Sequence, residues 1–555
     1  MATPTVPLAS ASTHTVTNQV PPLSGRNLFT DNVPLVEGLA REGGAWGAQR
    51  AHEVGAFWGG EPLAWGFEAN EHEPVLHTHA RTGERLDSVT FHPAWHQLMA
   101  ASVRDELHAL PWRTDQPGAH VVRGALMMTA GQAEAGFMCP TTMTFAAIPA
   151  LREQPEILAH WEPLLTATTY DGDLRPAPEK GSALCGMAMT EKQGGSDVRA
   201  NTTIAVPVNG GGAGAEYLLT GHKWFCSAPM CDLFLVLAQT DEGLSCFALP
   251  RFLPDGSKNE GFQLQRLKDK LGNRSNASSE VEFRGAWAQM VGEPGRGVPT
   301  IIEMVGHTRL DCVLGSAGGM RAAVAQATWH ASHRSAFGRT LIDQPLMRNV
   351  LADLALESEA ATAVALRLAR AYDMADTDPA EAHLKRLATA VAKYYVCKRA
   401  PQHAFEALEV LGGNGFVEDS GMPRIYREAP LCSIWEGSGN VMALDVLRAL
   451  SRTPETLHAF LAEVESASGG DARLDAFIVK LRDEFADTDA IETRARRVVE
   501  RMALALQGSL LVRHSPAAVA DAFCAARLDG DAGLNYGTLP ASTDTEGILA
   551  RHVPR

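Results

Sequence analysis

A single carboxylate in a glycine-rich segment is the first feature of this sequence that could do chemistry. The segment is Ile434–Asn440, IWEGSGN, in which Glu436 follows a tryptophan and precedes a glycine. A carboxylate whose pKa is raised by burial can act as a general base, and an adjacent glycine lets the chain turn tightly beside a ligand. The same residue types also occur in helix caps and in polar loops. The segment alone is compatible with a base, a cap or a loop.

Two motifs in the middle of the chain could contact a planar or anionic ligand. In MAMTEKQGGSD, Met187–Asp197, two adjacent glycines would let the backbone approach a ligand closely. In GHKWFCSAP, Gly221–Pro229, Phe225 and Ser227 alternate along an expected strand and would face the same side. A Gly-rich hairpin turn and a core aromatic are the plain alternatives. Neither motif is a Walker loop or a GxGxxG fingerprint, so a Rossmann fold is not expected.

Two motifs in the second half end long helical runs and could hold phosphate groups. Arg334 stands in HRSAFGR at an expected helix break, where a guanidinium can reach a phosphate. In EVLGGNGF, Glu409–Phe416, three of four consecutive residues are glycines whose N–H groups could cradle a pyrophosphate. A solvated arginine and a helix C-cap are the alternatives, although a single glycine would be enough for the cap.

The composition is that of a globular protein and disfavours several functional classes. Hydrophobic residues make up 45% and charged residues 21% of the 555 residues. No apolar run is long enough to span a membrane, and the N-terminus lacks the pattern of a signal or transit peptide, so a cytoplasmic location is expected. The nine cysteines form no CxxC pair, which predicts reduced thiols and no metal site. A net charge of −16 disfavours non-specific binding of nucleic acid by the molecule as a whole.

The hydrophobic periodicity predicts a mostly helical α+β protein with one central β-domain. Residues 1–32 are rich in Ser, Thr and Pro and are expected to form an extended arm. A helical domain is expected over 33–184, and short alternating runs predict a β-barrel or sandwich over 185–290. Long helical patterns then predict a bundle over 291–450 and an extra helical domain over 451–555.

In their order and spacing these motifs resemble those of the acyl-CoA dehydrogenase family. The family patterns are matched by MTEKQGGSD, by KLGNRSNASSEVEF, by the RxxFG of Arg334–Gly338, by GGNG and by the WEGS of the opening segment. The match covers roughly residues 100–450. Longer stretches such as MTEKQGGSDVRANTT and SIWEGSGNVMALDVLR, together with the C-terminal region, resemble the AidB-like branch, flavoproteins of the bacterial adaptive response to DNA alkylation.

The resemblance implies FAD bound without a covalent link between the β-domain and the bundle, in a homotetramer. Glu436 would be the base that removes the α-proton of an acyl-CoA, and Arg309 would be a second catalytic residue near it. Arg334, Phe337, Gly412, Gly413 and Gly415 would touch the phosphates or adenine of a neighbouring subunit's FAD. The residues that would line the flavin are Met187, Ala188, Met189, Thr190, Glu191, Lys192, Gln193, Gly194, Gly195, Ser196, Phe225, Cys226, Ser227, Ile434, Trp435, Gly437, Ser438, Gly439 and Asn440.

Several residues depart from the family pattern and widen the range of expected functions. Lys192 and Glu409 replace a usual proline and glutamine, and Met442 and Ala443 stand where a Gln-Arg pair is common. We therefore expect weak α,β-dehydrogenation of a short or branched acyl-CoA together with protection against DNA alkylation. The alternatives are a metabolic acyl-CoA dehydrogenase without DNA binding and a non-catalytic, DNA-associated flavoprotein scaffold.

The resemblance also implies binding of double-stranded DNA through a basic surface of the C-terminal domain. Residues 451–555 hold 12 Lys and Arg against 16 Asp and Glu, which is not the balance of a typical DNA-binding domain. Arg494, Arg497 and Arg501 nevertheless share one face of an expected helix and are the candidate DNA contacts. The alternative is a solvated charged face shared with neighbouring acids.

Overall fold

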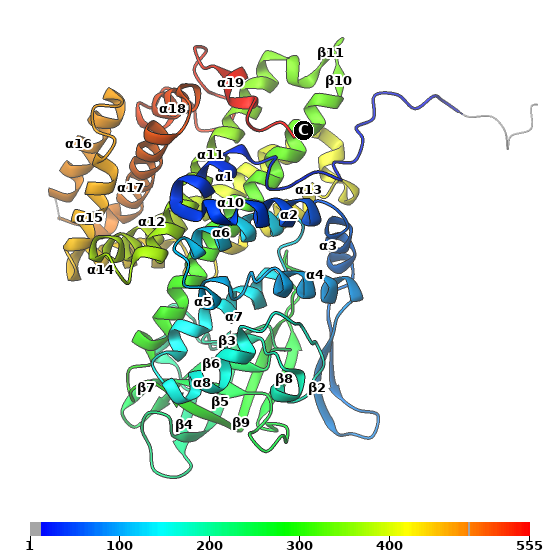
Figure 1. Ribbon diagram of the computed structural model, residues 1–555, viewed down its shortest axis with the longest axis vertical. Coiled ribbons are helices and arrows are strands. Elements are labelled where there is room, and N and C mark those ends of the chain that lie inside the picture. Colours follow the sequence, from blue (N-terminus) through cyan, green and yellow to red (C-terminus); the bar gives the residue numbers. More distant parts are fainter. Residues whose placement is uncertain (1–12, 487–488, 555) are drawn as a thin grey trace, which may run out of the picture.

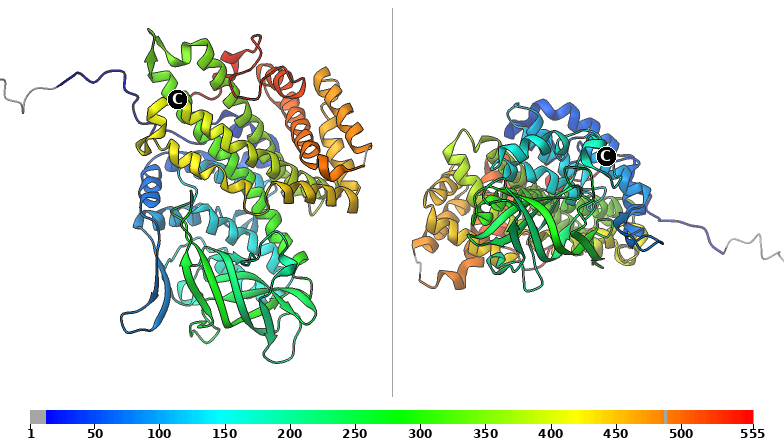
Figure 2. Two further views of the ribbon diagram at one scale, coloured as in Figure 1. Left: turned by 180° about the vertical axis from the view of Figure 1, so that it is seen from behind. Right: turned by 90° about the horizontal axis from the view of Figure 1, so that it is seen from below.

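The computed structural model describes residues 13–486 and 489–554. The first twelve residues of the expected arm lie outside the described residues, and residues 13–32 contain turns and bends without a helix or strand. Figures 1 and 2 show a β-barrel at one end of the molecule and stacked helices at the other. The mostly helical α+β architecture expected from the sequence is confirmed.

The N-terminal helices begin frequently with proline, whose fixed φ suits the first helical turn, as in α3, α4 and α8. Helices α6 and α7 are buried along almost their whole length, which explains why they are apolar all round. The elements of this region are α1 (Val33–Leu39), η1 (Ala40–Gly44), η2 (Ala45–Gly47), α2 (Ala48–Trp58), α3 (Pro62–Glu71), α4 (Pro93–Arg104), α5 (Leu110–Arg113), α6 (Ala119–Ala130), α7 (Met138–Leu151), α8 (Pro155–Leu165) and α9 (Ala177–Lys180).

A β-hairpin interrupts the N-terminal helices, where the sequence predicted mainly helix. Its strands are β1 (Val75–His79) and β2 (Arg85–Thr90), and Gly83 turns between them with a φ of 92°. The hairpin lies beside the barrel, as Figure 1 shows. The Arg85 guanidinium donates to the carbonyl oxygen of Leu264 at 2.7 Å, so tertiary contacts with β8 stabilise the pair of strands.

The central strands close into a barrel whose order is β6-β4-β5-β9-β7 and back to β6, with β3 beside β6 and β8 beside β9. Pairing is antiparallel except that β6 runs parallel to β3 and to β4. Strands β6 and β7 are almost continuously apolar because both of their faces are buried. The strands are β3 (Cys185–Ala188), β4 (Ile204–Pro207), β5 (Glu216–Ser227), β6 (Leu233–Thr240), β7 (Gly243–Pro250), β8 (Phe262–Leu267) and β9 (Ser278–Val291), with the short helix η3 (Val198–Ala200) between β3 and β4.

Long helices form the bundle above the barrel. At 37 residues, α10 is about 55 Å long and contacts both the barrel and the N-terminal helices. Helix α12 ends before Gly412, whose φ of 60° makes it the left-handed residue that stops the helix. The elements are α10 (Gly297–His333), β10 (Ser335–Ala336), β11 (Arg339–Thr340), η4 (Leu341–Asp343), α11 (Pro345–Met374), α12 (Pro379–Val410), η5 (Gly412–Phe416), η6 (Glu418–Ser420), α13 (Met422–Glu428), η7 (Leu431–Ser433) and α14 (Gly439–Arg452).

The C-terminal helices pack against α11, α12 and α14 of the bundle. The Arg527 guanidinium pairs with the buried carboxylate of Asp353 on α11, which fixes this packing. No helix in the described part of the chain is long and apolar enough to cross a membrane. The elements are α15 (Glu455–Glu465), α16 (Ala472–Ala486), α17 (Ile491–His514), α18 (Ala517–Phe523), η8 (Cys524–Leu528) and α19 (Thr545–Leu549).

Candidate active site

Glu436 lies in a tight loop between η7 and α14 whose backbone is held in an uncommon conformation. Glu436 has a φ of 57° and Gly437 a φ of 111°, so both adopt left-handed backbone angles. Such angles are rare for a residue with a side chain and persist only where the surroundings impose them. Here the buried Lys393 ammonium of α12 donates to the carbonyl oxygen of Trp435 at 2.8 Å and also to that of Gly437. Lys393 therefore fixes the loop on both sides of Glu436.

The Glu436 carboxylate lies inside the protein against α10. Its Oε2 accepts a hydrogen bond from the hydroxyl of Thr308 at 2.7 Å, and Thr308 itself is buried. Burial raises the pKa of Glu436, while the Thr308 hydrogen bond and the charges of Arg309 and Lys393 lower it. A buried carboxyl with a raised pKa and one hydroxyl partner suits a general base.

Arg309 supports the loop rather than the carboxylate. Its Nε donates to the carbonyl oxygen of Glu436 at 3.0 Å, and its Nη1 pairs with Asp445 on α14 at 2.9 Å. Asp445 also pairs with Arg386 and Arg448, so three guanidinium groups share one carboxylate. The sequence predicted a catalytic role for Arg309, whereas its contacts are those of a positioning residue.

A cavity of about 110 Å³ begins at Glu436 and follows α10. Gly315 and Gly319 line it and leave room because no side chain projects from them. Thr308 and Ala322 both line the cavity, and fourteen helical residues separate them, which corresponds to about 21 Å along α10. Side chains of α7, α12 and α13 complete the walls. The cavity therefore has the shape of a long pocket with the carboxylate at one end.

A buried ion pair fastens the helices around this pocket. The Arg123 guanidinium of α6 binds both oxygens of Asp311 on α10 at 2.7 Å each, and both side chains are almost fully buried. The hydroxyl of Thr142 on α7 donates to the same carboxylate at 2.6 Å. This bidentate pair holds α6, α7 and α10 in a fixed arrangement.

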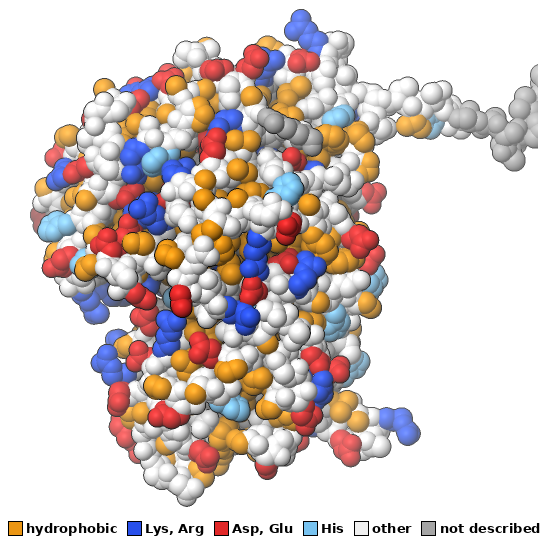
Figure 3. Space-filling model, viewed as in Figure 1, with side chains coloured by type: hydrophobic (Ala, Val, Ile, Leu, Met, Phe, Trp, Pro, Cys, Tyr) orange, Lys and Arg blue, Asp and Glu red, His pale blue; other side chains and the backbone are white. Residues whose placement is uncertain are grey.

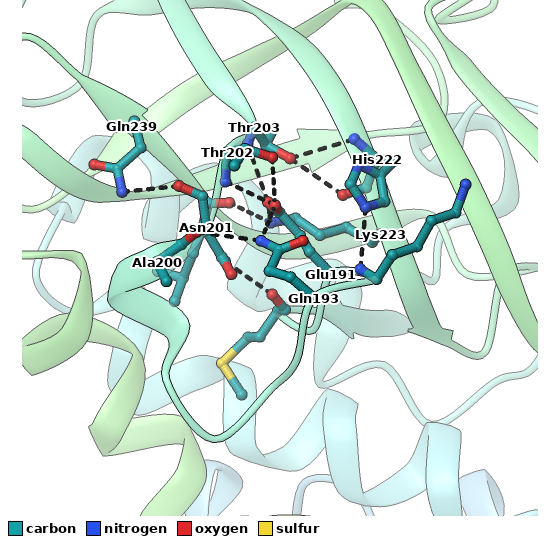
Figure 4. A network of polar contacts seen from close by, with 12 residues as sticks. Glu191, Gln193, Ala200, Asn201, Thr202, Thr203, His222, Lys223 and Gln239 are labelled. Atoms are coloured by element: carbon teal, nitrogen blue, oxygen red, sulfur yellow. Dashed lines mark hydrogen bonds and ion pairs between the residues drawn. The ribbon is translucent and has the colours of Figure 1, made fainter.

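The MTEKQGGSD segment leaves β3 and lies against β5, because the N–H of Trp224 donates to the carbonyl oxygen of Thr190 at 2.8 Å. The Glu191 side chain turns into the barrel, where it binds the Lys223 ammonium at 2.8 Å and accepts the N–H groups of Thr202 and Thr203 (Figure 4). Lys223 and these donors hold the pKa of Glu191 far below its usual range. The side chain of Glu191, one of the residues predicted to line the flavin, is therefore bound inside the barrel.

The neighbouring residues of this segment surround that ion pair. Met187 and Ala188 are buried in β3. The Lys192 N–H donates to His222 at 3.0 Å, and the Gln193 amide donates to Glu191 at 2.8 Å. Met189 follows β3 and is half-buried against the apolar core, whereas Gly194, Gly195 and Ser196 lie at the turn after Glu191.

The end of β5 divides its side chains between two faces. Phe225 is 48% exposed on the outer face of the barrel, and Ser227 is half-buried. Ser227 lies beside the Cys139 thiol of α7, which lines the cavity at Glu436. Cys226 faces the opposite way into the barrel core, and burial raises the pKa of its thiol to about 12. The alternation expected for Phe225 and Ser227 is interrupted by an irregularity in the pairing of β5 with β9 between Lys223 and Cys226, and the Cys226 side chain is directed away from the cavity.

The loop at Glu436 brings the other predicted residues of its segment to the start of α14. Ser438 and Gly439 begin this helix, and the Asn440 side chain accepts a hydrogen bond from Arg496 of α17 at 2.8 Å. Ile434 is exposed. Trp435 lines the cavity, and its buried Nε1 has no partner among the described residues.

The predicted phosphate contacts lie apart from the carboxylate end of the cavity. Arg334 follows α10 and donates to the carbonyl oxygen of Asn18, and Phe337 is 98% exposed at the tip of the β10–β11 hairpin. Figure 1 shows this hairpin at the opposite end of the molecule from the barrel. Gly412 and Gly413 stand in open space at η5, while Gly415 is packed against the backbone of α12. Within one chain these residues do not converge on Glu436.

The three candidate DNA contacts on α17 surround one carboxylate. Arg494, Arg497 and Arg501 all pair with Glu484 of α16, a buried acid, at 2.8 Å and 3.0 Å for the first two. The predicted shared face is thus present, and the group carries more positive than negative charge. Figure 3 shows acidic and basic side chains interspersed over the visible face of these helices.

Sequence reasoning missed two residues that shape the site, Thr308 and Lys393. Thr308 directly precedes Arg309, and Lys393 interrupts the apolar run ATAVAKYYVC. A lysine in such a run is costly to bury without acceptors, which was a signal that it holds a specific partner.

Comparison with known proteins follows the same division of the chain. Residues 18–172 match the adaptive response protein AidB N-terminal domain. Residues 186–286 and 295–451 match the middle and C-terminal domains of acyl-CoA dehydrogenases.

Individual relatives cover nearly the whole chain. The sequence is 45% identical to AidB of Escherichia coli strain K12 over 525 residues, which is 94% of this chain and 96% of that protein. It is 30% identical to acyl-CoA dehydrogenase family member 11 of Caenorhabditis elegans, covering 81% of this chain and 77% of that one. The crystal structure of ACDH-11 of Caenorhabditis elegans in complex with C11-CoA superposes with a TM-score of 0.84 at 26% identity, covering 99% of this chain and 95% of that chain. The chain therefore belongs to the acyl-CoA dehydrogenase family and, within it, to the AidB-like branch.

Proposed function

We propose that this protein oxidises the Cα–Cβ bond of an acyl-CoA thioester, with Glu436 as the base and FAD as its cofactor. The observation that carries the proposal is the carboxylate of the half-buried Glu436, bonded to Thr308 at the head of a cavity that follows α10 for about 21 Å. A carboxylate in this position meets the first carbons of a chain that enters the pocket. The family membership supplies the type of reaction.

The residues around the barrel edge fit a flavin. Phe225 offers an exposed aromatic face, a Cβ on Gly194 would meet nothing within 4 Å, and the buried Trp435 Nε1 is an unpaired donor. Thr190, Ser227 and the turn around Gly194 would hold the ring. FAD supplies the two-electron acceptor for the hydride that leaves Cβ.

The protein's own residues account for the proton transfer. Glu436 takes the α-proton, and its raised pKa makes it a stronger base than a solvated carboxylate. The Thr308 hydroxyl orients the carboxylate, and Lys393 and Arg309 fix the backbone of its loop. Trp435, the residue before Glu436, lines the same cavity.

The length of the cavity favours a longer acyl chain than the short or branched one expected from the sequence. A relative of the same architecture was solved with C11-CoA. The test is to incubate the FAD-loaded protein with octanoyl-, dodecanoyl- and hexadecanoyl-CoA and an artificial electron acceptor, and to measure 2-enoyl-CoA by mass spectrometry. Formation of enoyl product in the wild type and its loss in Glu436→Gln support the proposal. Equal product in both would contradict it.

We also propose that the protein forms a homotetramer in which the hairpin tip and η5 contact a neighbouring subunit's FAD. The exposed Phe337 (98%) and Phe416 (83%) support this assembly, because large apolar side chains at such positions are typical of contacts between subunits. Sedimentation velocity should give a tetramer, and Phe337→Asp should weaken both assembly and FAD retention. A monomer that retains FAD fully would contradict the assignment.

A second function, binding of double-stranded DNA during the response to DNA alkylation, is supported by the likeness to AidB and by the arginine group at Glu484. Replacing Arg497 and Arg501 with alanine should weaken retention of duplex DNA and reduce its dependence on salt concentration. Replacing Arg482, which pairs with Glu465 at another edge of α16, is the matched control. Unchanged affinity and salt dependence in the double variant would refute this role.

A further inference from the structure

The far end of the cavity is polar, although its middle is lined by small and apolar residues. Its polar side chains come from the segment after α6, the loop before β9 and helix α13. They are Gln132, Glu134, Asn273, Arg424 and Glu428. The first four are at least nine-tenths buried.

The position of this group along α10 places it away from Glu436. Gly318 of α10 packs closely against Met128 of α6, because a Cβ on Gly318 would lie 2.9 Å from the carbonyl oxygen of Met128. Met128 precedes Gln132 by about one helical turn, so Gln132 lies near the level of Gly318 along α10. The Glu436 carboxylate contacts Thr308, ten residues earlier on α10, or about 15 Å along the helix. An acyl chain whose thioester lies at Glu436 would therefore direct its tail toward Gln132.

Two atoms at this end lack a hydrogen-bond partner among the residues that the structure describes. One is Nη1 of Arg424, whose Nη2 donates to the carbonyl oxygen of Ala133 at 3.0 Å. The other is Oε1 of Gln132, whose amide nitrogen makes two long contacts with backbone oxygens at 3.3 and 3.4 Å. A buried donor and a buried acceptor left unpaired are unfavourable, and the two residues that carry them both line the cavity. A ligand group that accepts from the Arg424 guanidinium and donates to the Gln132 amide oxygen would satisfy both.

The acids nearby determine what kind of group fits. Glu134 is used by the protein, because it accepts the N–H of Gly136 and the hydroxyl of Ser275. Glu428 accepts the N–H of Asn273 at 2.6 Å, and burial and the charge of Glu134 raise the pKa of Glu428 to about 7. A carboxylate tail would lie next to two acids, and an ammonium tail next to the Arg424 guanidinium. A neutral group that both donates and accepts avoids both conflicts.

We propose that the acyl chain bound by this protein carries a neutral hydrogen-bonding group, such as a hydroxyl, at its far end, held by Arg424 and Gln132. This inference rests on the proposed acyl-CoA function and specifies its substrate class. A methyl-ended chain would displace water from the two unpaired atoms without replacing its hydrogen bonds, whereas a hydroxyl can bond to both. Sites built to bond a substrate hydroxyl discriminate against analogues that lack it.

The test compares acyl-CoA chains of matched length that end in a methyl, a hydroxyl or a carboxylate. Binding to the FAD-loaded protein is measured by isothermal titration calorimetry, and flavin reduction is followed in parallel. At the length that fits best, the wild type should bind the hydroxyl-ended chain about tenfold more tightly than the methyl-ended chain, equivalent to about 1.4 kcal/mol.

Variants at the tail end should remove this preference without preventing binding. In Gln132→Leu and in Arg424→Met the ratio of the two affinities should fall toward one. Arg427→Met is the matched control on α13, because Arg427 pairs with Glu418 outside the cavity, and it should keep the ratio. If Arg424→Met does not fold, Gln132→Leu tests the same prediction.

Three results would overturn the inference. Equal affinities for the methyl and hydroxyl chains at every length would mean that water alone satisfies the two atoms. Tightest binding of the carboxylate-ended chain would mean that the end recognises an anion. If no acyl-CoA binds or reduces the flavin, the proposed function fails and this inference fails with it. The first two results would overturn only the inference and would leave the proposed function standing.

Discussion

Replacing Thr308 with valine removes the hydrogen bond that its hydroxyl donates to the Glu436 carboxylate and should make this carboxyl harder to ionise. The bond is 2.7 Å long, lies in the protein interior and stabilises the charged form of Glu436. A hydrogen bond to a charged group contributes about 1.5–3 kcal/mol. Its loss therefore raises the pKa of Glu436 further above its already raised value, because each loss of about 1.4 kcal/mol of stabilisation makes ionisation about tenfold less favourable.

The rate of flavin reduction reports this shift, because only the ionised carboxylate can take the α-proton. In anaerobic stopped-flow measurements with a saturating acyl-CoA, the acid limb of the pH–rate profile should move to higher pH in Thr308→Val. The two rates should approach each other at high pH, where both carboxyls are ionised. Thr308→Ser keeps the hydroxyl and should keep the wild-type limb. An unmoved limb in Thr308→Val, or a shift to lower pH, would refute the assigned role of Thr308.

The remaining predictions concern the supports of the site and of the barrel. Lys393→Met removes the donors to the carbonyls of Trp435 and Gly437, so flavin reduction should slow by roughly 100-fold while the circular dichroism spectrum stays helical; a near-normal rate would contradict its role in holding the loop. Arg309→Lys keeps the charge but loses the planar contact with the carbonyl of Glu436 and with Asp445. The rate of flavin reduction should therefore fall about tenfold, while the acid limb of its pH–rate profile stays unchanged. A shift of this limb would instead indicate a direct effect of Arg309 on the Glu436 carboxylate. Glu191→Gln leaves Lys223 buried without its counter-charge and should lower the free energy of unfolding in urea by about 3–5 kcal/mol, and Glu191→Gln with Lys223→Met should recover most of this loss. The pKa of Glu191 is lower in the folded than in the unfolded protein, so the Glu191–Lys223 pair stabilises the fold at neutral pH. This stabilisation should be lost as the pH falls through the unfolded-state pKa and then the folded-state pKa of Glu191. A Glu191→Gln variant as stable as the wild type would contradict the importance of the pair.

The order of helices and strands could be predicted because each long element carries its own period and its own stop signal. Helix α12 ends at the predicted glycine pair, and Gly412 adopts the left-handed angle that such a stop requires. The β1–β2 hairpin could not be predicted in the same way. Its strands are short and largely exposed, and their stability depends on the contact of Arg85 with the distant Leu264.

The carboxylate proposed as the base could be located from a local motif, but its surroundings could not. Glu436 stands in a recognisable segment, whereas Thr308 is 128 residues away in the sequence and meets it only through the packing of α10. The inward direction of the Glu191 side chain depends on Lys223, which is buried on the same face of β5 as Tyr217 and Leu219. Side-chain direction at such places is set by tertiary register, which residue types alone do not encode.

The polar end of the cavity is a further feature that no local sequence pattern predicts. Gln132 and Arg424 are 292 residues apart, and neither belongs to a motif that resembles the family. They line one cavity because α13 packs beside the end of α6, with Arg424 bonded to the backbone of Ala133.

The central claim, that Glu436 is the base for oxidation of an acyl-CoA, is tested most directly by the visible absorbance of the bound flavin. The FAD-loaded wild type and Glu436→Gln are each mixed anaerobically with dodecanoyl-CoA and its hydroxyl-ended counterpart. We predict that the wild-type flavin is bleached, while Glu436→Gln keeps its FAD and stays oxidised. Bleaching of both proteins at the same rate would contradict it.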